Sequence, residues 1–119
     1  MQCKVTITGI TMDTDSNTPI VILKTEDDRI LPIWIGLLEA TAIATELRDI
    51  RFDRPMTHDL IKNFADMLDV TFTNVDIYDL RNNTYYARID FTFMGKHLSL
   101  DARPSDAMAL ALRTGIPIF

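Results

Sequence analysis

The sequence predicts an α+β fold in which a β-β-β-α unit occurs twice, with an extra helix inserted between the two copies. Segments of alternating apolar and polar residues, typical of half-buried strands, come in two groups of three, and each group precedes a segment with helical periodicity. Short matches also recur at intervals of 66 and 67 positions. The matched positions are 13, 17 and 18 with 79, 83 and 84, and 39–44 with 106–111. We therefore expect one domain, residues 1–119, with repeats at about 3–48 and 69–113.

The first repeat is predicted to contain three strands and a helix. Pro32 interrupts the third strand, which indicates an edge strand or a bulge because proline cannot donate a ladder hydrogen bond. From Gly36 to about residue 48 the apolar spacing is helical. The three strands are expected at residues 3–12, 20–24 and 29–35, separated by turns rich in acidic and small polar residues.

The inserted helix and the second repeat show the same signals. Residues 57–69 carry the apolar stripe of an amphipathic helix, with Thr57 as the expected N-cap. The last helix is expected to begin near Pro104 and to stop at Gly115. The strands of the second repeat are predicted at residues 70–78, 84–94 and 97–100.

A polar cluster precedes the last helix. Asp101, Arg103, Ser105 and Asp106 lie where a strand should give way to an alanine- and leucine-rich helix. That helix is apolar on most of its face, so we expect it to be buried, with the polar cluster at its accessible start. Either Ser105 or Asp106 can cap the helix. A purely structural role of the cluster and a functional one are therefore both open.

Three helix starts are expected to meet. Glu39 and Asp106 occupy equivalent positions in the first turns of the two repeat helices, so a pseudo-twofold arrangement would bring these turns together. The inserted helix, which starts with residues 57–59, could join them. Helix N-termini present unpaired N–H groups and the positive end of the helix dipole, so such a meeting point would attract anions.

The side chains near these helix starts suit metal and phosphate chemistry. Carboxylates with one histidine fit Mg²⁺ or Mn²⁺, which prefer oxygen ligands and activate water beside a phosphoryl group. His58 could act as a general base or simply bond to Thr57. No compact metal motif and no glycine-rich phosphate loop is present. Four aromatic residues lie in strand patterns and are predicted to be core residues or cross-strand pairs: Trp34, Tyr78, Tyr85 and Tyr86.

Composition limits the classes of protein that fit. The formal net charge of −5 at pH 7 counts against nucleic-acid binding through bulk electrostatics, but not against a small basic patch. No apolar run reaches the roughly 18 residues of a membrane-spanning helix. The single cysteine cannot form an internal disulfide, and the N-terminus lacks the apolar core of a signal peptide. We therefore expect a soluble cytoplasmic protein that makes no membrane contact.

Five short motifs resemble the bifunctional nuclease domain, a family found in bacteria, archaea and plants. They occur in the family's order, and the resemblance covers essentially the whole chain. The motifs are residues 31–36 (LPIWIG), 39–40 (EA), 54–60 (RPMTHDL), 101–107 (DARPSDA) and 117–118 (PI). The resemblance implies a duplicated α+β fold and nuclease activity on both DNA and RNA. Members of the family usually continue beyond the position of residue 119.

The resemblance and the expected meeting of helix starts support metal-assisted hydrolysis of phosphodiester bonds in DNA and RNA. His58 would act as the general base or proton shuttle. The predicted metal ligands, which are also the catalytic carboxylates, are Glu39, Asp59, Asp101 and Asp106. The predicted substrate-binding residues are Arg54, Thr57, Arg103 and Ser105.

A second hypothesis is a non-catalytic regulatory or interaction domain that binds a small anionic ligand or a protein partner. The acidic composition favours it. Solvent exposure separates the two hypotheses: carboxylates that are buried and paired with arginine favour a structural network, and unpaired carboxylates that face each other across a cleft favour an enzyme. The strand edge near Pro32 and the apolar segment 116–119 would allow a homo-oligomer.

Overall fold

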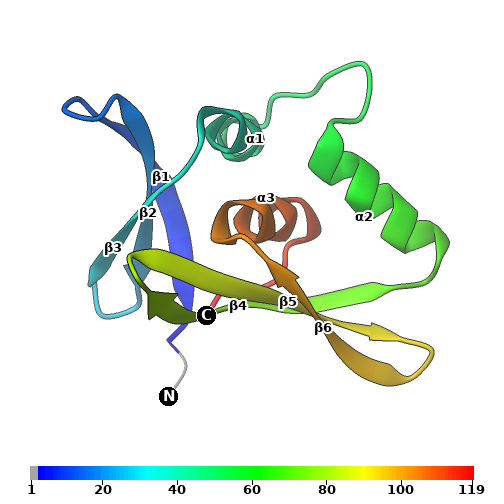
Figure 1. Ribbon diagram of the computed structural model, residues 1–119. Coiled ribbons are helices and arrows are strands. Elements are labelled where there is room, and N and C mark those ends of the chain that lie inside the picture. The colour runs from blue at the N-terminus through cyan, green and yellow to red at the C-terminus, as the bar shows by residue number, and fades with distance from the viewer. Residues whose placement is uncertain (1–2) are drawn as a thin grey trace.

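The computed structural model describes residues 3–119 and contains two β-β-β-α units with one helix between them (Figure 1). The first unit is β1 (Val5–Asp13), β2 (Thr18–Thr25), β3 (Ile30–Trp34) and α1 (Leu37–Leu47). The inserted helix is α2 (Thr57–Met67). The second unit is β4 (Thr71–Arg81), β5 (Thr84–Phe93), β6 (Lys96–Ala102) and α3 (Pro104–Thr114). This arrangement confirms the predicted fold class.

Each unit forms a three-stranded antiparallel sheet, in the order β1-β2-β3 and β4-β5-β6. Pro32 lies in β3, an edge strand, as its missing N–H predicted. Ile118 joins the two sheets, because it bridges Val5 of β1 and Val75 of β4. Ile118 is 5% exposed, so this residue of the apolar segment 116–119 lies inside the fold.

Helix α3 is the centre of the core. Residues 107–111 are each at most 2% exposed, and α3 packs on both other helices and on β4 and β5 (Figure 1). Three of these five residues are alanines, whose small side chains let the neighbouring elements approach closely. The predicted burial of this helix is confirmed.

The recurring Asp-Asn-Thr positions mark equivalent hairpins. Asn17 in the β1–β2 turn and Asn83 in the β4–β5 turn have positive φ angles of 55° and 63°. Asn82 has a φ of 50°, so both central residues of the second turn adopt the left-handed conformation of a tight type I′ hairpin. Strand β4 therefore continues to Arg81, three residues beyond its predicted end.

The helix starts differ from the predicted caps. Met56 and not Thr57 is the N-cap of α2, and Arg103 is the N-cap of α3, with Pro104 directly after it. Neither Ser105 nor Asp106 caps α3, because the helix begins before them and Asp106 bonds to the Arg103 side chain instead. Gly115 ends α3 in the left-handed conformation, as predicted.

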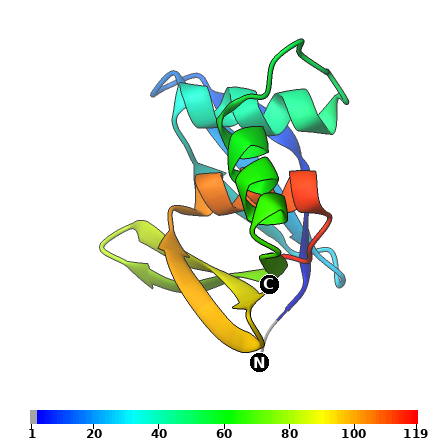
Figure 2. The same cartoon turned by 90° about the vertical axis from the view of Figure 1, so that its right-hand side faces the viewer.

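Helices α1 and α3 run side by side and begin at the same end, while α2 crosses in front of α3 (Figure 2). The crossing buries His58 and Ala65 of α2, and much of the rest of that helix stays exposed. Within residues 3–119, no helix has the length and apolar character needed to cross a membrane.

Candidate functional site

A chain of charged contacts links the starts of all three helices. Arg103 places Nη1 2.8 Å from Oε1 of Glu39, which lies in the first turn of α1. The Arg103 Nε donates to Oδ2 of Asp106 at 2.9 Å. Oδ1 of Asp106 lies 3.1 Å from Nε2 of His58, in the first turn of α2. We call these four residues the helix-start junction.

Side-chain exposure increases along the junction from His58 to Arg103. The His58 side chain is 9% exposed and the Arg103 side chain 65%. Burial alone would raise the pKa of Asp106, but hydrogen bonds from Arg103 and His58 outweigh it and hold this pKa below its ordinary value. The ionised carboxylate can therefore orient the His58 ring. A histidine oriented by a carboxylate can act as a general base.

Gly36 provides space for the Glu39 carboxylate at the start of α1. A Cβ built at position 36 would overlap this carboxylate. The φ angle of −75° at Gly36 is accessible to any residue, so the close approach of Glu39 and not backbone strain favours glycine here.

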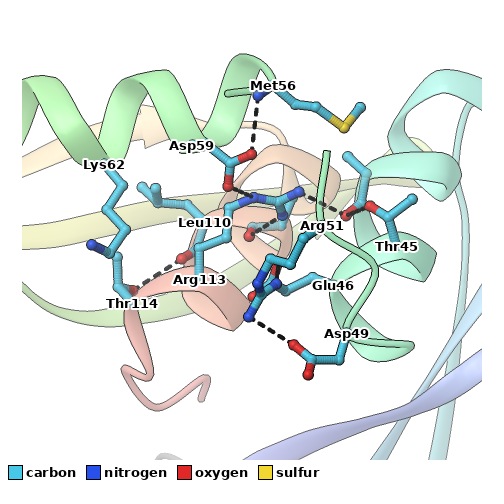
Figure 3. Close-up of polar contacts among 12 residues, drawn as sticks. Thr45, Glu46, Asp49, Arg51, Met56, Asp59, Lys62, Leu110, Arg113 and Thr114 are labelled. Carbon is cyan, nitrogen blue, oxygen red and sulfur yellow. Dashed lines mark hydrogen bonds and ion pairs between the residues drawn. The ribbon is translucent and has the colours of Figure 1, made fainter. Parts of the chain in front are cut away.

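A second polar cluster surrounds Arg113 in the last turn of α3 (Figure 3). The Arg113 side chain is 3% exposed. Its Nε donates to Oδ1 of Asp59 in α2 at 2.8 Å, and its Nη2 donates to the carbonyl oxygen of Ala42 in α1 at 3.1 Å. Its Nη1 donates to the carbonyl oxygen of Ala109 at 2.9 Å. One guanidinium therefore ties α3 to both other helices.

Asp59 belongs to this second cluster and not to the junction. Its Oδ2 accepts the backbone N–H of Met56 at 3.0 Å. Burial alone would raise the pKa of Asp59, but this N–H and Arg113 outweigh it and hold the pKa below its ordinary value. His58 and Asp59 thus contact residues seven positions apart on α3, about 10 Å along its axis.

The remaining predicted site residues take no part in the side-chain contacts of either cluster. Arg54, Thr57 and Asp101 are exposed, and their side chains form no hydrogen bond or ion pair among residues 3–119. Ser105 is buried, with 6% exposure. Asp106 pairs with Arg103, as the structural hypothesis expects, but not with Arg54, and its side chain keeps 36% exposure.

The predicted metal ligands do not gather at one point. Across the described part of the chain, no three His, Cys, Asp or Glu side chains lie close enough to hold a metal ion. Glu39 and Asp106 share Arg103, and Asp59 pairs with Arg113. This donor set does not fit the predicted divalent ion as arranged, so no catalytic step is assigned to one.

Two cavities border the clusters. One of about 330 Å³ is lined by Arg103, Glu39 and Trp34, among others. The other, of about 380 Å³, is lined by Arg54 and Arg113, among others. Both volumes lie in the range of sites for small ligands.

Sequence reasoning missed Arg113 and the exposure of Trp34. Arg113 is the one cation of α3, the helix that the sequence predicts to be buried, and that isolation was the signal that could have identified it. Trp34 was predicted to lie in the core or in a cross-strand pair. It is not a core residue, because it ends an edge strand and is 53% exposed, but it does face Ile20 across β2 and β3. The tilted pair of Tyr78 and Tyr86, with ring centroids 6.4 Å apart, confirms the cross-strand prediction for those two residues.

Comparison with known proteins agrees with the motifs. The sequence model of the bifunctional nuclease domain matches residues 21–119. An uncharacterized protein of Mycobacterium tuberculosis is 41% identical over 117 residues, which are 98% of this chain and 70% of the relative. Bifunctional nuclease 1 of Oryza sativa subsp. indica is 31% identical over 103 residues, which are 82% of this chain and 31% of the relative. Bifunctional nuclease 1 of Arabidopsis thaliana is 27% identical over 105 residues, or 84% and 32% of the two chains.

This chain thus spans about a third of the length of the plant relatives that it matches. The family match, by contrast, extends over all of α1, α2 and α3 and over both clusters described above. The chain belongs to the bifunctional nuclease domain family.

Proposed function

We propose that this chain hydrolyses phosphodiester bonds of DNA and RNA at the helix-start junction. Membership of the family supports a nuclease-related function with nucleic acid as the substrate. The observation that carries the site is the contact of Asp106 with both His58 and Arg103, because it sets an oriented histidine beside a cation. The other cluster lacks a histidine, and its arginine is fully engaged in holding helices together.

The proposed chemistry assigns each group a step. Asp106 accepts the Nε2–H of His58, which leaves Nδ1 to take a proton from the attacking water. The water oxygen bonds to phosphorus, the phosphodiester P–O bond breaks, and the leaving oxygen takes a proton from solvent. Arg103, exposed at the rim, balances the charge that develops on the phosphoryl oxygens.

The test is hydrolysis of single-stranded DNA, double-stranded DNA and RNA by the purified protein, with Mg²⁺, Mn²⁺ or EDTA. We expect activity in the natural protein and its loss in Asp106→Asn purified identically. Activity that survives EDTA would agree with the metal-free steps above, whereas loss of activity with EDTA would contradict them and support the divalent-ion requirement predicted from the sequence. Equal activity in both preparations would indicate a contaminating nuclease and would contradict the site.

Gly36→Ala tests the predicted catalytic role of Glu39 while keeping the Glu39 side chain. We expect the new methyl group to displace the Glu39 carboxylate and to separate it from Arg103, because the end of a flexible side chain moves easily. Since Arg103 is largely exposed, the free energy of unfolding in urea should fall by less than about 1 kcal/mol. Hydrolysis should fall at least severalfold. Unchanged kcat and KM would show that the position of Glu39 does not matter to catalysis.

One observation favours the non-catalytic alternative. Glu39, Arg103, Asp106 and His58 all find partners in one another, and His58 is nearly buried, as in a network that only holds helices together. Under that alternative the natural protein would hydrolyse none of the three substrates, while Asp106→Asn would still lower the stability. The hydrolysis assay and a denaturation curve of the same preparations therefore separate the two functions.

We propose further that two copies associate through the exposed face of α2. Leucine, isoleucine, phenylalanine and methionine side chains recur along this face at helical spacing and are between 43% and 83% exposed. A large side chain can bury roughly 200 Å², so one that is about half exposed has about 100 Å² left to bury in an interface. Five such side chains on each copy would bury about 1,000 Å² in total, near the lower limit for a specific interface. The five residues are Leu60, Ile61, Phe64, Met67 and Leu68.

Phe64→Glu tests this association. We expect the natural protein to sediment as a dimer at micromolar concentration and the variant to sediment as a monomer, because a buried unpaired carboxylate opposes association. Leu38→Glu is the matched control, since Leu38 is 84% exposed on α1, and it should remain dimeric. A monomeric natural protein, or a dimeric Phe64→Glu variant, would contradict the proposal.

We also propose that the protein works in the cytoplasm. The only cysteine of the sequence, Cys3, is exposed and free. An exposed free thiol persists in a reducing compartment, where internal disulfides are rare.

A further inference from the structure

A groove leads from the junction to the first hairpin, and apart from the junction residues at one end its lining has no part in the proposed chemistry. It combines the cavity of about 330 Å³ beside Arg103 with one of about 650 Å³. Both cavities are lined by Trp34, Asn83 and Tyr85, so they adjoin along these three residues. The walls are β3 and the ends of the β1–β2 and β4–β5 hairpins, which lie on the left of the molecule in Figure 1. We call this space the hairpin groove.

Trp34 offers an aromatic surface in the hairpin groove. It ends β3 and is 53% exposed, although tryptophan is the largest apolar side chain. Its Nε1 donates to Oδ2 of Asp13 in β1 at 2.9 Å, which holds the indole in one orientation. A ring that is already fixed loses little conformational freedom when a ligand stacks on it.

Arg103 lies at the other end of the same groove, where its Nη1 and Nε pair with Glu39 and Asp106 and its Nη2 is left to contact a phosphate. A guanidinium matches the geometry of a phosphate group. The groove also contains the carboxylates of Glu39 and Asp13, but each is engaged, by Arg103 and by Trp34 respectively. A nucleotide laid along the groove would therefore meet a cation at its phosphate and an aromatic ring at its base.

We propose that the hairpin groove binds single-stranded nucleic acid, with one base stacked on Trp34 and the adjacent phosphate held by Arg103. This inference rests on the proposed function and names the form of substrate that the junction receives. Bases inside a duplex are stacked on one another and cannot reach a ring in the wall of a groove. Stacking tolerates any base, so the groove accepts DNA and RNA strands of varied sequence.

The chain contains one tryptophan, so selectively excited tryptophan emission reports on this groove alone. The probe is an oligodeoxythymidine with phosphorothioate linkages, which slow hydrolysis during the titration. We expect saturable quenching of the Trp34 emission by this oligonucleotide and much weaker binding of a duplex of equal length. Unchanged emission at saturation, or equal affinity for the duplex, would overturn the inference.

Variants are compared through the fluorescence anisotropy of a labelled copy of the oligonucleotide, which does not need tryptophan. Trp34→Leu should weaken binding roughly tenfold to a hundredfold, the usual effect of losing one stacked base. Trp34→Phe keeps an aromatic face and should bind with intermediate affinity. Tyr78→Leu is the matched control, because Tyr78 is 43% exposed outside the groove, and its affinity should be unchanged. Equal affinity of Trp34→Leu and the natural protein would overturn the inference.

Hydrolysis assays on the same preparations separate this inference from the proposed function. If binding depends on Trp34 but the protein has no hydrolytic activity, the inference about the groove stands and the catalytic proposal is contradicted. If the natural protein and Trp34→Leu both hydrolyse single strands with the same KM, the catalytic proposal stands and the inference about the groove is contradicted. Circular dichroism of each variant verifies that it is folded.

Discussion

His58→Gln is expected to lower the rate of phosphodiester hydrolysis by about 10²- to 10⁴-fold, the usual contribution of a general base. The glutamine amide can still donate a hydrogen bond to Asp106, so the contact between α2 and α3 is kept while the proton acceptor is lost. Because substrate binding is assigned to Arg103, the loss should lie in kcat, with little change in KM. Initial rates over a range of substrate concentrations measure both constants.

Two further measurements make the His58 prediction specific. In His58→Ala, added imidazole should restore part of the rate, because it can occupy the space of the missing ring beside Asp106. Thermal denaturation of His58→Gln should resemble that of the natural protein. A kcat that is unchanged in a folded His58→Gln variant would exclude His58 as the base and would favour a purely structural junction.

Arg113→Met is expected to lower the free energy of unfolding by about 3 kcal/mol. The substitution keeps the length of the apolar stem but removes the donors to Asp59, Ala42 and Ala109. Two carbonyl oxygens then lose a partner, and the Asp59 carboxylate loses its countercharge. Urea denaturation of the natural and variant proteins measures this difference in the free energy of unfolding. Stability is the property to measure because Arg113 lies apart from the helix-start junction.

Lys62→Met is the matched control for Arg113. Lys62 pairs with Asp66 at 3.0 Å within α2, with side chains that are 37% and 62% exposed. Such a surface pair contributes at most about 1 kcal/mol, so this variant should unfold nearly as the natural protein does. Equal losses in the two variants would contradict the role given to Arg113.

The loss of stability at low pH gives an independent test of the contact between Arg113 and Asp59. Asp59 has an ordinary pKa of 3.8 and a lower pKa in the folded protein. Its stabilising contribution is therefore fully present above pH 3.8 and is lost as the pH falls from there through the folded-state value. In Arg113→Met the folded-state pKa should rise, so this part of the loss on acidification should shrink. An identical pH dependence in both proteins would contradict the pairing.

The sequence by itself determined the local structure and the pairing of the repeats. Alternation and helical spacing depend on neighbouring residues, so they identified six strands and three helices together with the edge position of Pro32. The equivalence of Glu39 and Asp106 followed from the duplication, and the structure places both on Arg103. Such features are visible in sequence because each residue's role is set within its own element or by its counterpart in the other repeat.

Only the tertiary structure decided which side chains share a site. His58 and Asp59 are adjacent in sequence, but successive residues of a helix point about 100° apart, so one contacts Asp106 and the other Arg113. The crossing of α2 over α3 determined this division and separated the carboxylates predicted to bind one ion. Likewise, Trp34 fits a core pattern in sequence, and only its place at the end of an edge strand, beside a groove formed by two distant hairpins, leaves it exposed.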